Sequence, residues 1–144
     1  MSGPTSWRCD ECAAAVAADG GLLAFRTQPH APYAAGGFRI LHVSCREPDD
    51  AELATVRLEA CLDRDGLSLL LGFLSAGPGR RPEPGLTVAD VDEFVDLIRR
   101  LHVPFYEPAR RRFGEPHVRR TMLRADRASP YQSPALRKLV QASG

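Results

Sequence analysis

The chain has 144 residues and a formal net charge of +1, and its 44% hydrophobic and 26% charged residues are typical of a soluble globular protein. This length suits one domain, or a core with a small appended finger, and leaves little room for a second large domain. The longest apolar stretch, residues 67–74, is far shorter than the ~20 residues of a membrane crossing, and the first residues lack a basic and then apolar leader. We therefore expect a cytoplasmic protein without a membrane partner.

The net charge conceals a strong asymmetry along the chain. Residues 1–50 sum to −2 and residues 51–98 to −5, whereas residues 99–144 carry ten Arg and one Lys against three acidic residues, a surplus of +8. Such a surplus indicates a polyanionic partner, either nucleic acid or an acidic face of another protein. The alternative is that these arginines pair with the acidic middle of the same chain, and the charge pattern does not decide between the two.

Two ligand pairs stand near the amino terminus. Cys9 and Cys12 form a C-x2-C pair, and after 29 intervening residues His42 and Cys45 form an H-x2-C pair. Reducing compartments keep thiols apart, so cysteines there bind metal or lie buried more often than they form disulfides. Two such pairs complete a tetrahedron, and three thiolates with one imidazole are typical of a closed structural Zn2+ site. The sequence therefore predicts Zn2+ bound by these four residues.

Two alternatives to this ligand set stay open. His30 can take the place of His42, or the spacing is a coincidence and the thiols are free and buried. Cys61, which has no partner at ligand spacing, is expected to be a small core residue. Because four protein ligands leave no position for water, we do not expect hydrolytic chemistry at this site.

The chain around the ligand pairs predicts a finger of known element order. Residues 22–26 and 38–43 read as strands joined by a loop rich in Pro and Gly, and acidic turn residues then begin a helix over residues 50–62. Knuckle, hairpin, second ligand pair and helix follow the treble-clef order. The pattern C-x2-C-x29-H-x2-C resembles the first finger of LIM domains over residues 7–62, although no second ligand set follows. The W-x-C-x2-C opening, the H-x2-C pair and residues 99–110 together also look like small zinc-finger proteins of GC-rich bacteria. Neither resemblance implies an activity.

The rest of the chain reads as helices. An i, i+3, i+4, i+7 leucine stripe predicts a helix over residues 66–75, with a hairpin over residues 57–73 as the weaker alternative. Residues 76–85 form a loop or linker. Thr87 with Asp90 resembles a capping box that begins a helix ending at Pro104. The core side of that helix is expected to carry Val91, Phe94, Val95, Ile98 and Leu101, and its solvent side Asp92, Glu93, Asp96 and Arg99.

Three shorter helices are expected after Pro104. One runs from Pro108 to Gly114, one from Pro116 to Arg127, and the last follows Ser133. The predicted fold class is therefore α+β. A treble-clef-like zinc finger of a β-hairpin plus a helix occupies residues 1–62, and a small all-α region with a basic end occupies residues 63–144.

The basic end is the candidate binding surface. Its arginines recur along the predicted turns: Arg110, Arg111, Arg112, Arg119, Arg120, Arg124 and Arg127. Such a face contacts phosphates without sequence preference. We expect a zinc-finger regulatory protein that contacts nucleic acid or the transcription machinery, or alternatively a protein-protein adaptor with a purely structural zinc. The pattern contains no nucleophile beside a base and no Gly-rich phosphate loop, so neither an enzyme nor a small-molecule substrate is expected.

Overall fold

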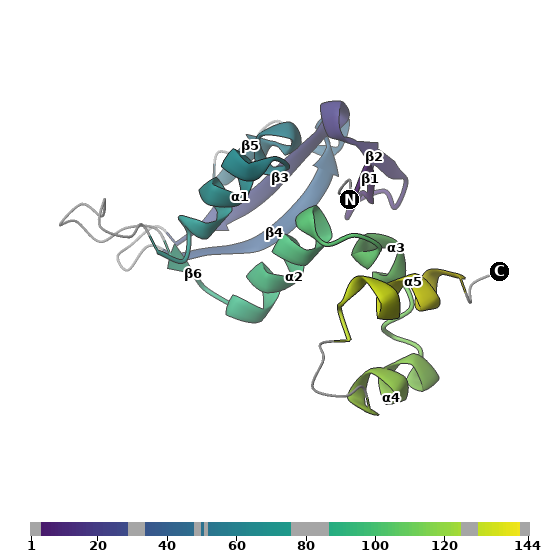
Figure 1. The fold of residues 1–144 in the computed structure, drawn as a ribbon. Coiled ribbons are helices and arrows are strands. Elements are labelled where there is room, and N and C mark those ends of the chain that lie inside the picture. Colours follow the sequence, from purple (N-terminus) through teal and green to yellow (C-terminus); the bar gives the residue numbers. More distant parts are fainter. Residues whose placement is uncertain are drawn as a thin grey trace. The chain divides into compact units, whose positions relative to one another are not determined.

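The computed structural model describes residues 4–28, 34–47, 50, 52–75, 87–124 and 130–141. The fold is α+β, as the sequence predicts, with strands and short helical turns followed by helices (Figure 1). The chain divides into two compact units, which we call the sheet unit (Thr5–Ile98) and the helical unit (Arg99–Gly144 with Met1–Pro4). Residues on both sides of position 62, the expected boundary, thus belong to the sheet unit. No helix in the described ranges is long and apolar enough to cross a membrane.

The strands of the sheet unit form one antiparallel ribbon and one mixed sheet. A two-stranded ribbon pairs β1 (Ser6–Arg8) with β2 (Ala15–Ala17). A four-stranded sheet has the order β5-β3-β4-β6, with the strands β3 (Gly21–Thr27), β4 (Ala34–His42), β5 (Leu53–Arg57) and β6 (Thr87–Val88). β3 pairs antiparallel with β4 and β5, and β6 runs parallel to β4. The predicted hairpin of residues 22–26 and 38–43 is therefore present, with longer strands.

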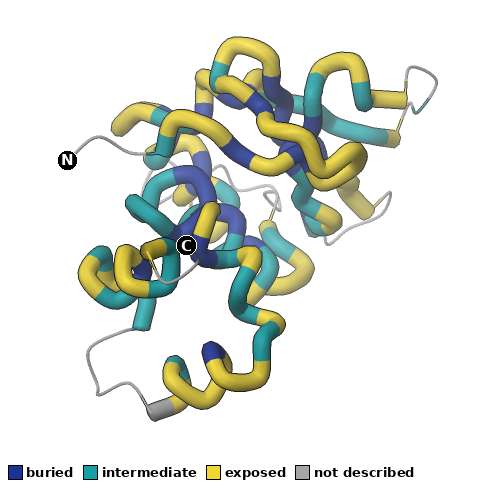
Figure 2. The backbone as a smooth tube through the Cα atoms, turned by 90° about the vertical axis from the view of Figure 1, so that its right-hand side faces the viewer, coloured by how far each residue is buried: buried dark blue, intermediate teal, exposed yellow. Residues whose placement is uncertain are grey.

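The aromatic part of the core lies on one face of this sheet. Leu23 of β3 pairs with Ile40 of β4, and both side chains are fully buried; burial along the backbone is shown in Figure 2. Beside them four phenylalanine rings lie with centroids 5.1–5.9 Å apart: Phe25, Phe38, Phe73 and Phe94. Phe73 follows α1 (Arg64–Leu71) and Phe94 belongs to α2 (Val91–His102), so both helices cover this face. Offset and edge-to-face aromatic pairs of this kind are stabilising beyond their buried area.

The prediction of a helix over residues 50–62 is wrong. Those residues instead form β5 and a 3-10 turn, Leu58–Cys61. The local sequence LATVR includes the β-branched Thr55 and Val56, and the outer edge of β3 offers unpaired backbone groups that a strand satisfies and a helix does not. The treble-clef helix is therefore not found at this position.

The helix expected over residues 66–75 is present as α1, and the alternative hairpin is wrong. α1 begins earlier because Asp63 caps it: its carboxylate accepts the amide N–H of Gly66 at 2.7 Å. Gly66 also has to be small, since a Cβ there would lie 2.3 Å from the carbonyl carbon of Cys61. The helix thus packs directly onto the preceding turn.

α2 forms where the sequence predicts a helix, with a different start and a different buried face. Thr87 lies in β6, and the cap is Asp90, whose carboxylate accepts the amide N–H groups of Asp92 and Glu93 at 2.9 and 3.3 Å. The buried apolar side chains are Phe94, Leu97 and Leu101, whereas Val91 is 58% exposed. On the expected solvent side, Glu93 accepts the amide N–H of Phe38 at 2.8 Å.

Three helices build the helical unit: α3 (Tyr106–Arg110), α4 (Pro116–Arg124) and α5 (Ser133–Gln141). All three were expected, although α3 starts two residues before Pro108. Tyr106, Ala109 and Leu136 are buried together where α5 packs on α3. In the same unit Arg100 and Glu107 form a bidentate ion pair with two 2.7 Å bonds, and both side chains are at most 4% exposed.

Candidate metal centre

The structure brings the four predicted ligands together. The Sγ atoms of Cys9, Cys12 and Cys45 and one ring nitrogen of His42 all lie within 4.8 Å of one another. His42 Nδ1 is 3.3 Å from Cys12 Sγ and 3.7 Å from Cys45 Sγ. A tetrahedral ion with Zn–S bonds of about 2.3 Å and Zn–N bonds of about 2.0–2.1 Å sets a nitrogen and a sulfur ligand about 3.6 Å apart, so these spacings suit one ion at the centre. The cluster can therefore hold a metal ion.

The first ligand pair lies on a tight turn between β1 and β2. The amide N–H of Cys9 donates to the carbonyl of Ala14 at 2.9 Å, and the amide N–H of Ala13 donates back to the carbonyl of Cys9 at 3.0 Å. Ala13 has φ +67°, a left-handed conformation that costs a residue with a Cβ roughly 1–2 kcal/mol. This tight turn, residues 9–14, which we call the knuckle, brings Cys9 and Cys12 into the cluster.

The second pair comes from the end of β4. His42 is the last residue of that strand, and Cys45 ends the 3-10 turn that follows it. The knuckle is fastened to the same strand by two reciprocal bonds: the amide of Asp10 donates to the carbonyl of Ile40 at 2.8 Å, and the amide of Ile40 donates to the carboxylate of Asp10 at 2.7 Å. The end of β4 thus brings together two ligand pairs that are separated by 29 residues in the sequence.

The ring of His42 is oriented for metal binding. Its Nε2 lies 2.8 Å from the carbonyl oxygen of Ala15, and because a carbonyl only accepts, Nε2 carries the proton and donates. Nδ1 is then left with its lone pair directed at the sulfurs. The bond to Ala15, followed by the neighbouring sulfur of Cys9, raises the pKa of His42. Metal-bound histidines have such a partner on the second nitrogen, which fixes the tautomer and the ring plane.

Two cysteines of the cluster, Cys9 and Cys45, differ in acidity. Burial of Cys9 opposes ionisation, but backbone amides, first among them that of Cys12, outweigh it and lower the pKa of Cys9 to about 6. Burial, with the neighbouring sulfurs, raises the pKa of Cys45 to about 11. Without a metal ion, the thiolate of Cys9 therefore lies near the protonated thiol of Cys45. A divalent ion replaces that proton, because the thiolate is the ligand.

The remaining cysteine and histidine candidates lie elsewhere. Cys61 is fully buried and its thiol lies 3.8 Å from the carbonyl of Arg57, outside the cluster. Burial raises its pKa to about 11, which suits the core role expected from the sequence. His30, the alternative ligand, lies outside the described residues.

Two residues that support the centre were missed at the level of sequence. Asp10 fastens the knuckle to β4, and Ala15 orients the His42 ring through its backbone carbonyl. The signal for Asp10 was available, since an acidic residue directly after the first cysteine can accept a backbone amide. Ala15 gave no signal because only its main chain is used.

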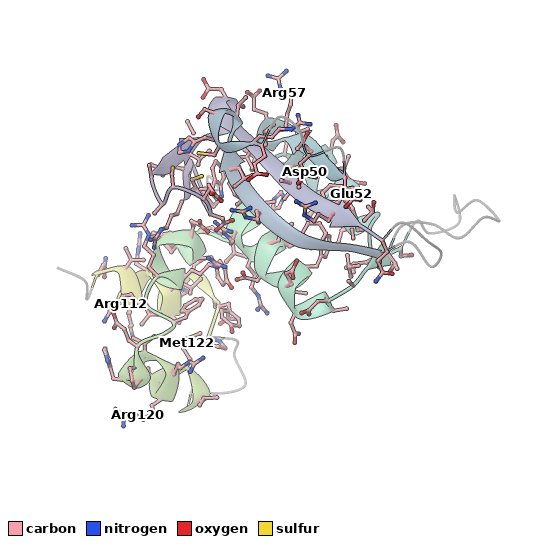
Figure 3. All side chains as sticks on the ribbon, turned by 180° about the vertical axis from the view of Figure 1, so that it is seen from behind. Asp50, Glu52, Arg57, Arg112, Arg120 and Met122 are labelled. Carbon is pink, nitrogen blue, oxygen red and sulfur yellow. The ribbon has the colours of Figure 1, made fainter. Side chains whose placement is uncertain are left out.

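The predicted arginines fall into different environments. Arg112 is largely buried, and its guanidinium binds the carboxylate of Glu115 at 3.0 Å and the carbonyl of Leu139 at 2.7 Å. Arg110 is half-buried. The side chains of Arg111, Arg119 and Arg120 are exposed, and Figure 3 labels Arg112 and Arg120. The side chain of Arg124 and the whole of Arg127 lie outside the described part of the chain.

Comparisons with protein-family models, with curated proteins and with solved structures found no match to this chain.

Proposed function

We propose that the Cys9, Cys12, His42 and Cys45 cluster holds one structural Zn2+. Three soft sulfur donors and one oriented imidazole are the donor set that Zn2+ prefers, and four protein ligands fill its tetrahedron. With no position left for a substrate or a water molecule, the ion has a structural role and the protein is not a zinc hydrolase. The ion fixes the knuckle to the end of β4, so that the sheet unit needs the metal for its full order.

We further propose that the helical unit binds nucleic acid through exposed arginines of α4 and the turn before it. The observation that carries this proposal is the environment of Arg111, Arg119 and Arg120. Among the described residues, none of these three guanidinium groups has a carboxylate within salt-bridge distance. Exposed cations of this kind are available to phosphate oxygens, which neutralise them and release bound counterions.

The main alternative is that the arginines only neutralise the chain's own acidic groups. Arg100 forms an ion pair with Glu107, and Arg112 forms one with Glu115, so internal pairing accounts for those two arginines. It does not account for Arg119 and Arg120. The surplus of positive charge in residues 99–144 therefore has an exposed component that suits an external polyanion.

The test is duplex DNA binding followed by fluorescence anisotropy across a salt series. Arg119→Gln combined with Arg120→Gln should weaken binding and make the salt slope shallower by about 1.8, since each phosphate contact contributes about 0.9. The matched control is Arg46→Gln combined with Arg64→Gln, which removes the same charge from exposed positions of the sheet unit. Equal losses in both double variants, or no binding by the wild-type protein at low salt, would contradict the proposal.

A second candidate function, a protein-protein adaptor, is favoured by one apolar feature of the helical unit. Leu123 of α4 is 85% exposed and borders a groove of about 470 Å3 with Phe113, Met122, Tyr131 and Arg119. Leu123→Gln leaves every arginine in place. An adaptor that uses this groove would lose its partner or its self-association in sedimentation velocity, whereas duplex binding through the arginines would stay unchanged.

A further inference from the structure

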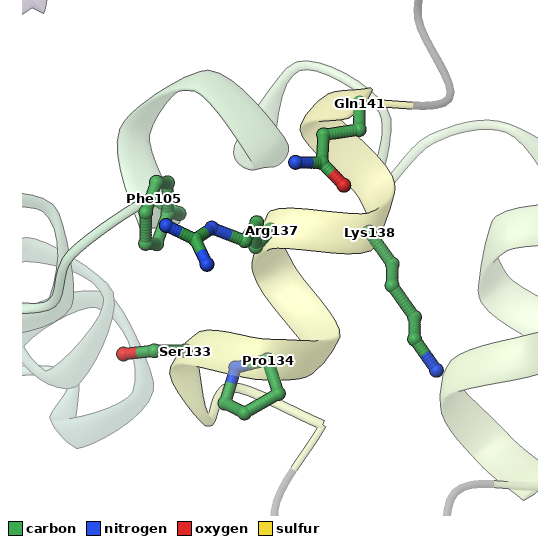
Figure 4. Close-up of a pocket in the computed structure, with 6 residues that line it drawn as sticks. All are labelled: Phe105, Ser133, Pro134, Arg137, Lys138 and Gln141. Carbon is green, nitrogen blue, oxygen red and sulfur yellow. The ribbon is translucent and has the colours of Figure 1, made fainter.

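A second groove of the helical unit lies along α5 and encloses about 450 Å3 (Figure 4). It is lined by Phe105, Ser133, Pro134, Arg137, Lys138 and Gln141. The ring of Phe105 and the pyrrolidine of Pro134 are apolar, and the other side chains are hydrogen-bond donors or cations. Of the described residues that line it, none is acidic. The groove therefore suits a ligand with a flat apolar face, polar edges and negative charge.

Phe105 is held firmly at this groove. Its backbone has φ +66°, a left-handed conformation that a residue with a Cβ adopts only at a cost in free energy. The side chain, partly buried, packs against the core of Tyr106, Ala109 and Leu136, and this packing stabilises the unusual backbone. The ring is thus ordered before any ligand arrives, which lowers the entropy lost on binding.

Arg137 adds a second flat group. Its guanidinium carbon lies 5.2 Å from the centre of the Phe105 ring, within the range of a cation–π interaction. Figure 4 shows Arg137 directed at Phe105, with the hydroxyl of Ser133 on the same side of α5 and Lys138 extending from the other side. Ser133, Arg137 and Gln141 follow one another at a spacing of four residues, so they line one side of the helix.

We propose that this groove binds an unpaired base of single-stranded nucleic acid. The base stacks on the Arg137 and Phe105 pair, the side chains of Ser133 and Gln141 reach its polar edge, and Lys138 binds a neighbouring phosphate. Arginine planes and aromatic rings stack on any base, whereas a base within a duplex is already stacked on its neighbours and paired. This inference rests on the proposed nucleic-acid function and makes it more specific, because it selects single strands over duplexes.

An acidic peptide is the competing occupant. Its carboxylates would bind Arg137 and Lys138, but they would make no use of the aromatic face of Phe105. The fixed ring beside a stacked guanidinium therefore favours the base. The two occupants are separated by probes that have the same charge and differ in the presence of bases.

The experiment compares three probes by fluorescence anisotropy at one salt concentration: a thymidine oligonucleotide, an abasic deoxyribose-phosphate strand of equal length, and a duplex of that length. The wild-type protein should bind the thymidine strand roughly five- to a hundredfold more tightly than the abasic strand, the range that corresponds to the stacking of one base. Equal affinity for these two strands would overturn the inference.

Two variants assign the preference to the groove. Phe105→Leu keeps an apolar side chain and removes the aromatic face, and the exposed Arg137→Lys keeps the charge and removes the flat group. Both should lose the preference for the thymidine strand over the abasic strand while duplex affinity changes less than twofold. Phe105→Tyr, which keeps the ring, should retain the preference. Thermal unfolding shows whether each variant folds, and Arg137→Lys tests the groove even if Phe105→Leu does not fold.

The outcomes distinguish this inference from the proposed function. If the protein binds none of the three probes, the nucleic-acid function itself fails. If all three bind and the losses in Arg137→Lys are equal for each, phosphate contact stands and the base site is overturned. If a glutamate-rich peptide binds the wild-type protein and not Phe105→Leu, while the thymidine strand shows no preference, the groove is a peptide site and the inference is also overturned.

Discussion

Replacing Cys12 with Ser tests the metal centre most directly. Cys12 is an exposed ligand on the knuckle, and its sulfur is 3.3 Å from His42 Nδ1, so its loss removes one corner of the tetrahedron without disturbing the core. Structural Zn2+ sites bind with about 10–16 kcal/mol at neutral pH, which is roughly 3 kcal/mol for each of four ligands. We therefore expect the affinity for Zn2+ to fall by about a hundredfold or more.

The structural consequence should be local to the knuckle. Besides the metal, the contacts that hold the knuckle include the hydrogen bonds at Cys9, Ala13, Asp10 and Ile40, each contributing about 1 kcal/mol, and an exposed ion pair between Glu11 and Arg39. The strain at Ala13 offsets one or two of these hydrogen bonds. Without the ion the knuckle is marginal. The four-stranded sheet has its own core and should stay folded.

Two measurements check this prediction. Competition with a chromophoric chelator measures the affinity for Zn2+, and amide hydrogen exchange compares the knuckle amides of Cys9, Asp10 and Ala13 with that of Leu23 in β3. The knuckle amides should lose protection in Cys12→Ser, whereas Leu23 should keep it. Cys61→Ala is the control, because it removes a cysteine outside the cluster and should leave metal affinity unchanged. Wild-type affinity in Cys12→Ser would refute the proposed ligand set.

Three further predictions concern pH, backbone strain and the buried ion pair. Because Cys45 has a pKa of about 11 without metal and must lose its proton to bind, the apparent Zn2+ affinity should rise between pH 6 and pH 9, about tenfold per unit for each proton released; a flat profile in chelator competition would count against it. Ala13→Gly should relieve the left-handed strain and protect the knuckle amides by up to about 1 kcal/mol in hydrogen exchange, and weaker protection would contradict the turn geometry. Glu107→Gln should destabilise the helical unit by about 3–5 kcal/mol in denaturant unfolding, because it removes the carboxylate charge that binds the buried guanidinium of Arg100 through two bonds. The double variant Arg100→Met with Glu107→Leu should recover most of that loss, and if it does not, the pair itself is the source of stability.

The sequence alone was enough to find the candidate metal centre. C-x2-C and H-x2-C are local patterns, because residues three apart on a tight turn converge whatever the rest of the fold does. The helices α1 and α5 were also predictable, since a leucine stripe at helical spacing and a Ser-Pro start are properties of the segment itself. The bond from His42 Nε2 to a backbone carbonyl was not, because it involves no side-chain pattern.

Only the tertiary structure decided the elements whose conformation depends on a distant partner. Residues 53–57 form β5 because they pair with the backbone groups along one side of β3. Thr87 lies in β6 for the same reason, since it pairs with β4. The buried face of α2 includes Leu97 and leaves Val91 exposed, since the sheet and its phenylalanine cluster set the direction of contact. The exposure of each arginine likewise depends on residues far away in the sequence. Arg112 donates to a carbonyl 27 residues away, whereas Arg119 and Arg120 are exposed. Composition determines how many charges a segment carries, but packing across long sequence separations determines which of them face the solvent.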